Sequence, residues 1–325
     1  MSKNEHVLIS GGTGFIGQYL IPVLLQQGHQ VTVYGRDKDK IQQLFGDAVD
    51  AFSDLSQINR PVNTIINLAG ANIGNSRWTA ANKQRFIMSR VGTTQALLAW
   101  AKQQVQPPQR LINGSAIGYY GIDTSEQWQQ VCDESSPPQP VFMSQLCSQW
   151  EQTTDGFKDL GCDIVKLRLG VVLGQGGGVL DAMIKPIKLA KVGKVGSGRQ
   201  PLVWVHIDDA VAVVLWLMAQ PHWQSEVYNV VAPQITSQAD FVNTACHVLK
   251  TRAPLHMPAT VMRLMLGEQS DLVLNGQKVA PKNLIEQGYG FQFADLSHAL
   301  ADLLQANEGK HSITKAANTT STANQ

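Results

Sequence analysis

Short apolar runs alternate with longer amphipathic segments over the first half of the chain. Each run is rich in Val, Ile and Leu, as a strand buried on both faces would be, and each longer segment has helical spacing of its apolar residues. We expect strands at 7–10, 30–34, 48–52, 64–68, 111–115 and 162–169, and helices at 15–27, 79–103 and 141–160. Strands and helices in alternation predict an α/β fold with a doubly wound parallel sheet.

A glycine-rich turn joins the first expected strand to the first expected helix. Gly11, Gly14 and Gly17 are spaced three residues apart, with Thr13, Phe15 and Ile16 between them. Glycine permits the tight turn, the approach of a pyrophosphate to bare backbone, and close packing of helix on strand. The helix N-terminus then presents its amides and positive dipole end to the phosphate. In this context the motif predicts a dinucleotide-binding Rossmann core; the alternative is an ordinary glycine-rich turn.

The second half of the chain is less regular. A strand at 203–207 leads into a helix at 208–219, a strand follows at 227–231, helices are expected at 179–192 and 238–249, and 193–200 forms a loop. We expect residues 1–175 to form the nucleotide-binding core, completed by strands from 200–235, and 176–304 to form a smaller C-terminal region on the substrate side. The Asn-, Thr- and Ser-rich tail at 305–325 is expected to be disordered.

The residues after the second strand bear on which dinucleotide is bound. An acidic residue at this strand end would accept hydrogen bonds from the 2′-hydroxyl of NAD, whereas a basic residue suits the 2′-phosphate of NADP. The strand end carries Gly35 and Arg36 instead of an acid. The planar guanidinium fork of Arg36 favours NADP(H). Asp37 could still reach a ribose, and Arg36 with Lys38 could simply be a solvated helix start.

Composition and charge narrow the class of protein. The chain has 325 residues, is 43% hydrophobic and carries a formal net charge of +1, so bulk charge indicates neither nucleic-acid nor membrane binding. Its four cysteines form no CxxC pair, so neither a metal site nor a disulfide framework is expected. Without a signal-peptide pattern or a membrane-length apolar run, we expect a cytoplasmic protein that takes a small-molecule substrate; a homodimer is left open.

Several motifs together resemble the extended short-chain dehydrogenase/reductases, and more closely their atypical 39U-like epimerase-family branch with its small C-terminal domain. The resemblance implies NADP(H) across the carboxyl edge of the sheet, Gly35 and Arg36 at the adenosine phosphate, and Leu68 and Ala69 along the cofactor. It also implies Arg90 beside the ribose and Val172 near the nicotinamide. The matching segments are Gly11–Gly17, Asn67–Gly70, Arg77–Trp78, Ser89–Arg90, Tyr119–Gly121, Leu146–Cys147, Trp150–Glu151, Arg168–Gly174, Gly196–Gly198, Trp204–Asp209 and Leu274–Val279.

The catalytic pattern of that wider family is incomplete in this chain. Ser115 matches the family's Ser/Thr, but the Tyr-x-x-x-Lys pair, in which lysine lowers the pKa of the tyrosine, is replaced by Met143 and Cys147. A register one residue earlier gives Phe142 and Leu146 instead. We therefore expect Tyr120 to act with Ser115; the other candidate acid–base residues are Tyr119, Glu134 and His206.

The sequence thus predicts an NADP(H)-dependent oxidoreductase or epimerase that transfers a hydride to or from a carbonyl or alcohol. A sugar nucleotide is one candidate substrate, with Lys194 and Arg199 as candidates for its anionic group or simply as solvated loop residues. Water or the substrate could supply the proton. The alternative, favoured by the missing Tyr and Lys, is an NADP(H)-binding sensor or scaffold without turnover.

Overall fold

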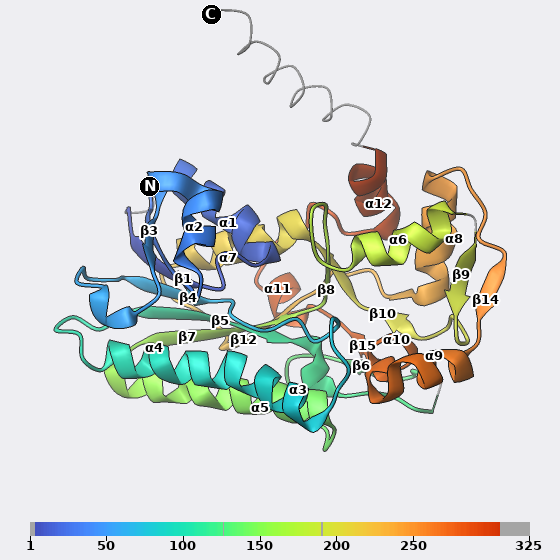
Figure 1. The fold of residues 1–325 in the computed structure, drawn as a ribbon, viewed down its shortest axis with the longest axis horizontal. Helices are drawn as coiled ribbons and strands as arrows, with labels where there is room; N and C mark the ends of the chain where they lie inside the picture. Colours follow the sequence, from blue (N-terminus) through green and yellow to red (C-terminus); the bar gives the residue numbers. More distant parts are fainter. Residues whose placement is uncertain (1–3, 126, 190, 306–325) are drawn as a thin grey trace, which may run out of the picture.

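A parallel sheet forms the centre of the molecule. The computed structural model describes residues 4–125, 127–189 and 191–305. Within these ranges seven parallel strands follow the order β12-β7-β5-β4-β1-β2-β3 (Figure 1). They are β1 (His6–Ser10), β2 (Gln30–Tyr34), β3 (Asp50–Phe52), β4 (Thr64–Asn67), β5 (Arg110–Ala116), β7 (Asp163–Leu169) and β12 (Val227–Val230). The chain leaves β1 first toward β3 and then returns toward β12, which confirms the doubly wound fold and makes the β1–β4 junction its switch point.

Helices cover both faces of this sheet (Figure 1). On one face, Ile9 of β1 shares a core with Leu20 of α1 (Phe15–Gln26) and Val213 of α7 (Ile207–Ala219). On the other face, the adjacent Leu8 packs with Leu97 of α4 (Thr93–Ala101). Neighbouring strand residues point to opposite faces, so continuous apolar runs are what two helical layers require.

Two of the expected long helices change helix type along their length, which the spacing of apolar residues did not predict. Thr79 caps α3 (Ala80–Ile87) by accepting from the Asn82 N–H, but a π-helical segment, η3 (Met88–Gly92), separates α3 from α4. Likewise α5 (Phe142–Thr153) continues as a 3₁₀ segment, η5 (Thr154–Leu160). The remaining short elements of this half are α2 (Lys38–Phe45), η1 (Gly46–Ala48), η2 (Leu55–Gln57) and η4 (Ile117–Tyr120).

The second half is built from short paired strands and helices. The helix expected at 179–192 is shorter, because α6 (Leu180–Lys188) contains Pro186 and ends two residues after it, and β9 (Val192–Val195) replaces part of the loop expected at 193–200. The strand pairs are β6 (Val131–Cys132) with β15 (Lys278–Val279), β8 (Val171–Leu173) with β11 (Trp204–His206), β9 with β14 (Leu255–Met257), and β10 (Pro201–Leu202) with β13 (Thr236–Ser237). The helices are α8 (Gln238–Val248), α9 (Ala259–Leu266), η6 (Gly267–Ser270), α10 (Asp271–Leu274), α11 (Lys282–Glu286) and α12 (Leu296–Gln305).

The start of α7 joins the two halves. His206 Nδ1 accepts from the Asp208 N–H at 3.1 Å, and its ring stacks on Phe293 at a centroid distance of 3.7 Å. Asp209 is buried and accepts from the N–H groups of Gln292 and Phe293, each at 2.8 Å. The C-terminal segment is therefore fixed to α7 by charge-assisted hydrogen bonds.

The structure bears on two further expectations, the lack of a membrane-spanning segment and the disordered tail. Among the helices in the described ranges, none combines the length and apolarity needed to cross a bilayer. The predicted disordered tail lies, from residue 306 onward, outside the described residues. The cytoplasmic location, the homodimer and the division at residue 175 stay predictions.

The buried His206 predicts a pH dependence of stability. Burial lowers the pKa of His206, and nearby Asp208, Asp302 and Asp209 only partly oppose this. As the pH falls, the imidazole in the unfolded chain takes up a proton at a higher pH than the buried imidazole does. The contribution of His206 to the free energy of unfolding is therefore fully present above about pH 6.5 and is lost as the pH falls toward the folded-state pKa. The loss is at most about 1.4 kcal/mol per pH unit.

Urea unfolding between pH 5 and 8 measures this contribution. His206→Asn keeps a side chain suited to the N-cap and is expected to flatten the acid side of the stability curve. Exposed His222 gives a matched control, because His222→Asn should leave the curve of the unsubstituted protein unchanged. An equal slope in His206→Asn would contradict a buried neutral imidazole.

Candidate active site

The turn after β1 requires glycine at two positions. Gly11 has φ +77°, and a Cβ there would lie 2.5 Å from the carbonyl carbon of Leu68 at the end of β4. A Cβ on Gly17 would lie 2.4 Å from the carbonyl oxygen of Gly12. These approaches hold the β1 turn against β4 and α1 against the turn, as the sequence motif predicts.

The N-terminus of α1 is available to an anion. Gly14 is the N-cap, no side chain of the described residues caps it, and the first turn carries no acidic residue. The first N–H groups and the positive dipole end therefore face the carboxyl edge without a side-chain partner. Phe15, the first helical residue, packs under the glycine loop 174–178, where a Cβ on Gly177 would lie 2.5 Å from its ring. Bare backbone thus flanks the helix tip on two sides, and a pyrophosphate fits this cradle.

At the end of β2, the carboxylate that could compete for the ribose is already bonded. Asp37 is the N-cap of α2 and accepts from the Lys40 N–H at 2.9 Å. The Gly35 N–H is bonded to the Phe52 carbonyl at 3.0 Å, and Arg36 is exposed beside it. The guanidinium of Arg36 is therefore exposed at this strand end, next to a carboxylate that is already bonded.

The π-helical segment places Arg90 on the turn after β4. Its Nη1 donates to the Ala71 carbonyl at 3.1 Å, and Ser89 accepts from the Ala71 N–H at 2.9 Å. The guanidinium also lies over the Trp150 ring, 5.3 Å from its centroid. One extra residue in a helical turn re-aims the side chains around it, which accounts for both neighbours pointing to one turn. Arg90 therefore braces the backbone beside Leu68 and Ala69.

A buried ion pair lies behind the end of β5. Arg168 and Glu151 form a two-pronged bridge, with Nε to Oε1 at 2.9 Å and Nη2 to Oε2 at 2.8 Å. Ser115 Oγ donates to the same Oε1 at 2.6 Å. Arg168 Nη1 donates to the Tyr120 hydroxyl at 2.9 Å, and that hydroxyl donates to Asn229 Oδ1 at 2.6 Å. Each charge thus has several hydrogen bonds, as a buried pair requires.

This network fixes the protonation of Tyr120. Burial raises the pKa of its phenol, and Arg168 opposes this only in part. The phenol therefore stays protonated at neutral pH. Arg168 is the cationic neighbour of this phenol, and its guanidinium also lies 3.4 Å from the Tyr119 ring centroid.

A cavity of about 510 Å³ opens in front of this network, between the sheet and the C-terminal region. Ala116 and Gly118 line it, whereas Ser115 and Tyr120 do not. Successive strand residues point to opposite sides, so the Ser115 hydroxyl faces α5 and the methyl of Ala116 faces the cavity. The full lining is Ile73, Trp78, Ala116, Ile117, Gly118, Gly121, Ile122, Pro140, Val141, Phe142, Met143, Leu169, Gly170, Val171, Glu268, Asp271, Leu272, Asn275, Gly276 and Gln277.

Met143 and Cys147 lie where the missing pair was expected. Met143 lines the cavity, and a Cβ on Gly118 would lie 3.2 Å from its methyl carbon and 3.7 Å from Cys147 Sγ. Both residues therefore contact the turn after β5. Burial raises the pKa of the Cys147 thiol to about 12, so it is neither a cation nor a proton donor of ordinary strength.

The other candidate groups are placed elsewhere. Glu134 is bonded through Oε1 to the N–H groups of Asn229 and Asn283, at 2.9 and 3.3 Å, and burial raises its pKa. His206 caps α7. Lys194 and Arg199 are exposed, and neither lines the cavity.

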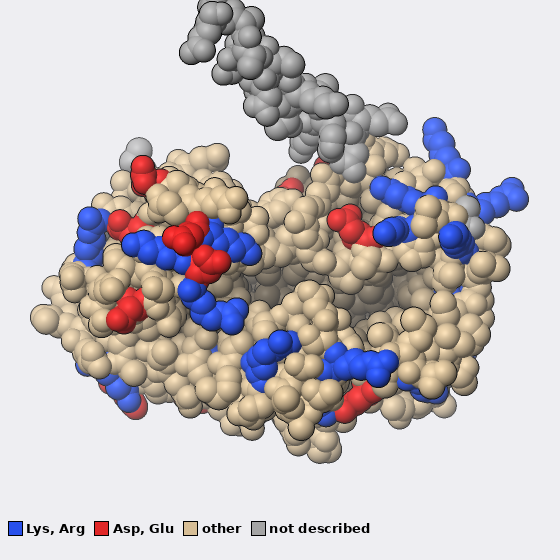
Figure 2. All heavy atoms as spheres, in the orientation of Figure 1, with Lys and Arg blue, Asp and Glu red and all other residues tan. Residues whose placement is uncertain are grey.

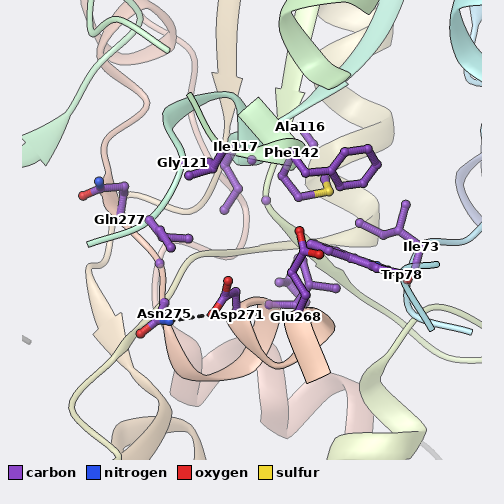
Figure 3. A pocket seen from close by; sticks show the side chains of 18 of the residues that line it. Ile73, Trp78, Ala116, Ile117, Gly121, Phe142, Glu268, Asp271, Asn275 and Gln277 are labelled. Atoms are coloured by element: carbon purple, nitrogen blue, oxygen red, sulfur yellow. Dashed lines mark hydrogen bonds between the residues drawn. The ribbon is translucent and has the colours of Figure 1, made fainter. Parts of the chain in front are cut away.

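The C-terminal region supplies one wall of the cavity (Figure 3). Gln269 donates to the carbonyls of Ile73 and Gly74 at 3.2 and 2.7 Å, and Lys83 pairs with Glu268 at 2.6 Å. These contacts hold η6 and α10 against the loop after β4. Figure 2 shows a hollow between the two halves of the molecule, and the surface visible inside it is mostly uncharged.

Comparison with known proteins places the chain in a family. The sequence profile of the NAD dependent epimerase/dehydratase family matches residues 7–231. The chain belongs to this family. Residues 257–303 match the Domain of unknown function (DUF1731), which here is the region that walls the cavity.

Members of the epimerase family resemble this chain over nearly its whole length. An epimerase family protein of Staphylococcus saprophyticus is 34% identical, covering 92% of this chain and 99% of the relative. The mouse epimerase family protein SDR39U1 is 33% identical over 92% of this chain and 99% of its own. These relatives confirm the resemblance drawn from the motifs.

Two solved structures share the fold of this chain. The human epimerase family protein SDR39U1, solved with NADPH, is 32% identical with a TM-score of 0.82, covering 92% of this chain and 99% of that one. The UDP-glucuronic acid 4-epimerase of Bacillus cereus has a TM-score of 0.75, covering 93% of this chain and 99% of its own. At 19% identity this second likeness shows the fold alone.

The cysteines give a test of the packing around the site. Cys132, Cys147 and Cys162 are buried and burial raises the pKa of each, whereas Cys246 is half-buried. Iodoacetamide at pH 7.5, followed by mass spectrometry, is expected to label Cys246 and to label the other three only in urea. Rapid labelling of Cys147 in the folded protein would contradict the packing of α5 on the β5 turn.

Proposed function

We propose that this protein is an NADP(H)-dependent oxidoreductase or epimerase that transfers a hydride to or from a carbonyl or alcohol carbon. The observation that carries the proposal is the uncapped glycine turn at the switch point of the sheet, with the cavity lying at the same carboxyl edge. The human relative was solved with NADPH, which supports the phosphorylated cofactor, although the Bacillus cereus epimerase was solved with NAD.

Different residues of the chain would bind different parts of NADP(H). The backbone at Gly11–Gly17 would hold the pyrophosphate, Gly35 and Arg36 would hold the adenosine phosphate, and Leu68 and Ala69 would line the cofactor. Arg90 braces that last turn, and Val172 lies half-buried in β8 beside the cavity residues Val171 and Gly170. A bound nicotinamide would supply or accept the hydride; the protein orients the substrate and excludes water.

The catalytic role predicted for Ser115 and Tyr120 stays a prediction. Their contacts support a positioning role, because both are bonded to the Glu151–Arg168 pair and neither lines the cavity. The ionisable groups that do line it are Glu268 and Asp271. We propose that proton transfer falls to one of these carboxyl groups or to water.

A second function has its own supporting observation. Met143 and Cys147 contact the turn where a Tyr and Lys pair would act, and neither can replace that pair. This favours an NADP(H)-responsive sensor or scaffold. NADPH consumption with a panel of carbonyl compounds separates the two: saturable turnover supports the enzyme, and tight NADPH binding without turnover supports the sensor.

Arg36 is expected to set the cofactor preference. Removing one charge-assisted hydrogen-bonding partner costs about 1.5–3 kcal/mol, so Arg36→Ala should lower the NADPH/NADH affinity ratio by about 10- to 150-fold. Fluorescence titration of both cofactors measures the ratio. Exposed Arg60, paired with Asp50 at 3.2 Å, is the control, since Arg60→Ala should leave the ratio unchanged. An unaltered ratio in Arg36→Ala would refute the assignment.

Ser115→Ala distinguishes positioning from catalysis. Loss of the hydrogen bond to Glu151 should cost about 1–3 kcal/mol of unfolding free energy, because a buried charged acceptor loses one donor. The NADPH affinity should stay within about twofold, and kcat should fall by much less than the factor of about 10² to 10⁴ typical of a lost acid–base group. Unchanged stability with a kcat loss in that range would make Ser115 catalytic.

A further inference from the structure

The charge of the cavity lining restricts the substrate. Among its lining residues, all within the described part of the chain, there is no lysine, arginine or histidine, whereas Glu268 and Asp271 both contribute carboxylates. These two face the sheet side of the cavity from the C-terminal wall (Figure 3). A diphosphate or carboxylate bound here would meet charges of its own sign, in surroundings that screen less than water.

The two carboxylates differ in their partners. Glu268 is neutralised by Lys83 at 2.6 Å. Asp271 accepts from the Asn275 amide, a neutral donor, at 2.8 Å. One hydrogen bond leaves the Asp271 carboxyl group with further acceptor capacity at the cavity wall.

Two cations beside the lining residues, Lys83 and Arg77, have partners of their own. Lys83 lies on the Phe142 ring, 4.7 Å from its centroid, and is committed to Glu268. Arg77 donates to the Met265 carbonyl at 3.1 Å. Neither residue lines the cavity.

The rest of the lining is apolar and partly aromatic. Trp78 and Phe142 meet edge to face, with centroids 5.3 Å apart, and Met143, Ile117 and Leu272 are among the other apolar residues of the lining. Such a wall suits a flat or branched hydrocarbon, and a flexible methionine adapts to its shape. At about 510 Å³ the cavity is in the size range of sites that enclose small organic ligands.

We propose that the substrate is a predominantly apolar alcohol or carbonyl compound that carries no phosphate or carboxylate, and that Asp271 accepts a hydrogen bond from a hydroxyl or amino group on it. The proposal rests on the proposed function and replaces the sugar nucleotide as its substrate class. Glu268, Asp271, Leu272 and Asn275 then set specificity from the C-terminal wall.

A matched ligand pair tests the charge argument on the full chain saturated with NADPH. The probes are 4-phenyl-2-butanone, its carboxylate-bearing analogue 4-(3-oxobutyl)benzoate, and UDP-glucose, each titrated by calorimetry. The neutral ketone is expected to bind at least 10-fold more tightly than the carboxylate, with no uptake of UDP-glucose. Equal or tighter binding of either anion, or no binding of the neutral ketone, would overturn the proposal.

A charge reversal at one position gives the decisive comparison. Asp271→Lys should shift the neutral-to-anionic affinity ratio by at least 10-fold toward the carboxylate analogue. Exposed Asp159, remote from the lining, supplies the control, and Asp159→Lys should leave the ratio unchanged. An unchanged ratio in Asp271→Lys would place ligand binding outside this cavity and overturn the proposal.

Failure of this proposal differs from failure of the proposed function. The NADPH affinity of each protein is titrated before any ligand is added. Loss of the function proposal appears as no NADPH uptake by the unsubstituted protein. Loss of the substrate proposal appears as normal NADPH uptake with preference for the anionic ligands or no ligand preference.

Discussion

The close approach of two backbone segments at the middle of the sheet is the constraint on which the site depends. Gly11 after β1 touches the carbonyl of Leu68 after β4, so neither side chain nor water separates the two turns. This contact lies where the chain reverses its winding direction, and there the carboxyl ends of the strands open a crevice. The uncapped tip of α1 and the turn braced by Arg90 meet at this point.

A buried network of side chains connects the carboxyl edge of the sheet to the cavity wall. The Glu151–Arg168 pair ties α5 to β7 and, through Ser115 and Tyr120, fixes the turn after β5 that forms part of the cavity wall. Removing one partner would leave a buried charge unpaired, so the position of this wall is coupled to an intact ion pair. The opposite wall comes from η6 and α10, attached to the loop after β4 through Gln269. The carboxyl edge of the sheet and the two walls of the cavity are thus positioned by different, linked contacts.

The sequence predicts the features that depend on neighbouring residues and leaves open those that depend on how distant segments pack together. The glycine turn and the helix that begins directly after it follow from neighbouring residues, and the structure bears them out. The direction of Ser115 does not follow, because a shift of one residue along a strand exchanges its two faces. The sequence placed the C-terminal region on the substrate side but did not single out positions 268, 271, 272 and 275, since only folding brings these residues to the cavity.

Calorimetric titration of NADPH against the unsubstituted protein and Gly14→Asp tests the central claim most directly. Gly14 is the N-cap of α1, and a Cβ there would lie 3.0 Å from the Gly11 carbonyl oxygen, so the variant adds bulk and negative charge at the proposed pyrophosphate position. The account predicts one NADPH site per chain and at least 100-fold weaker binding in the variant. No NADPH uptake by the unsubstituted protein, or equal affinity in both, would contradict it.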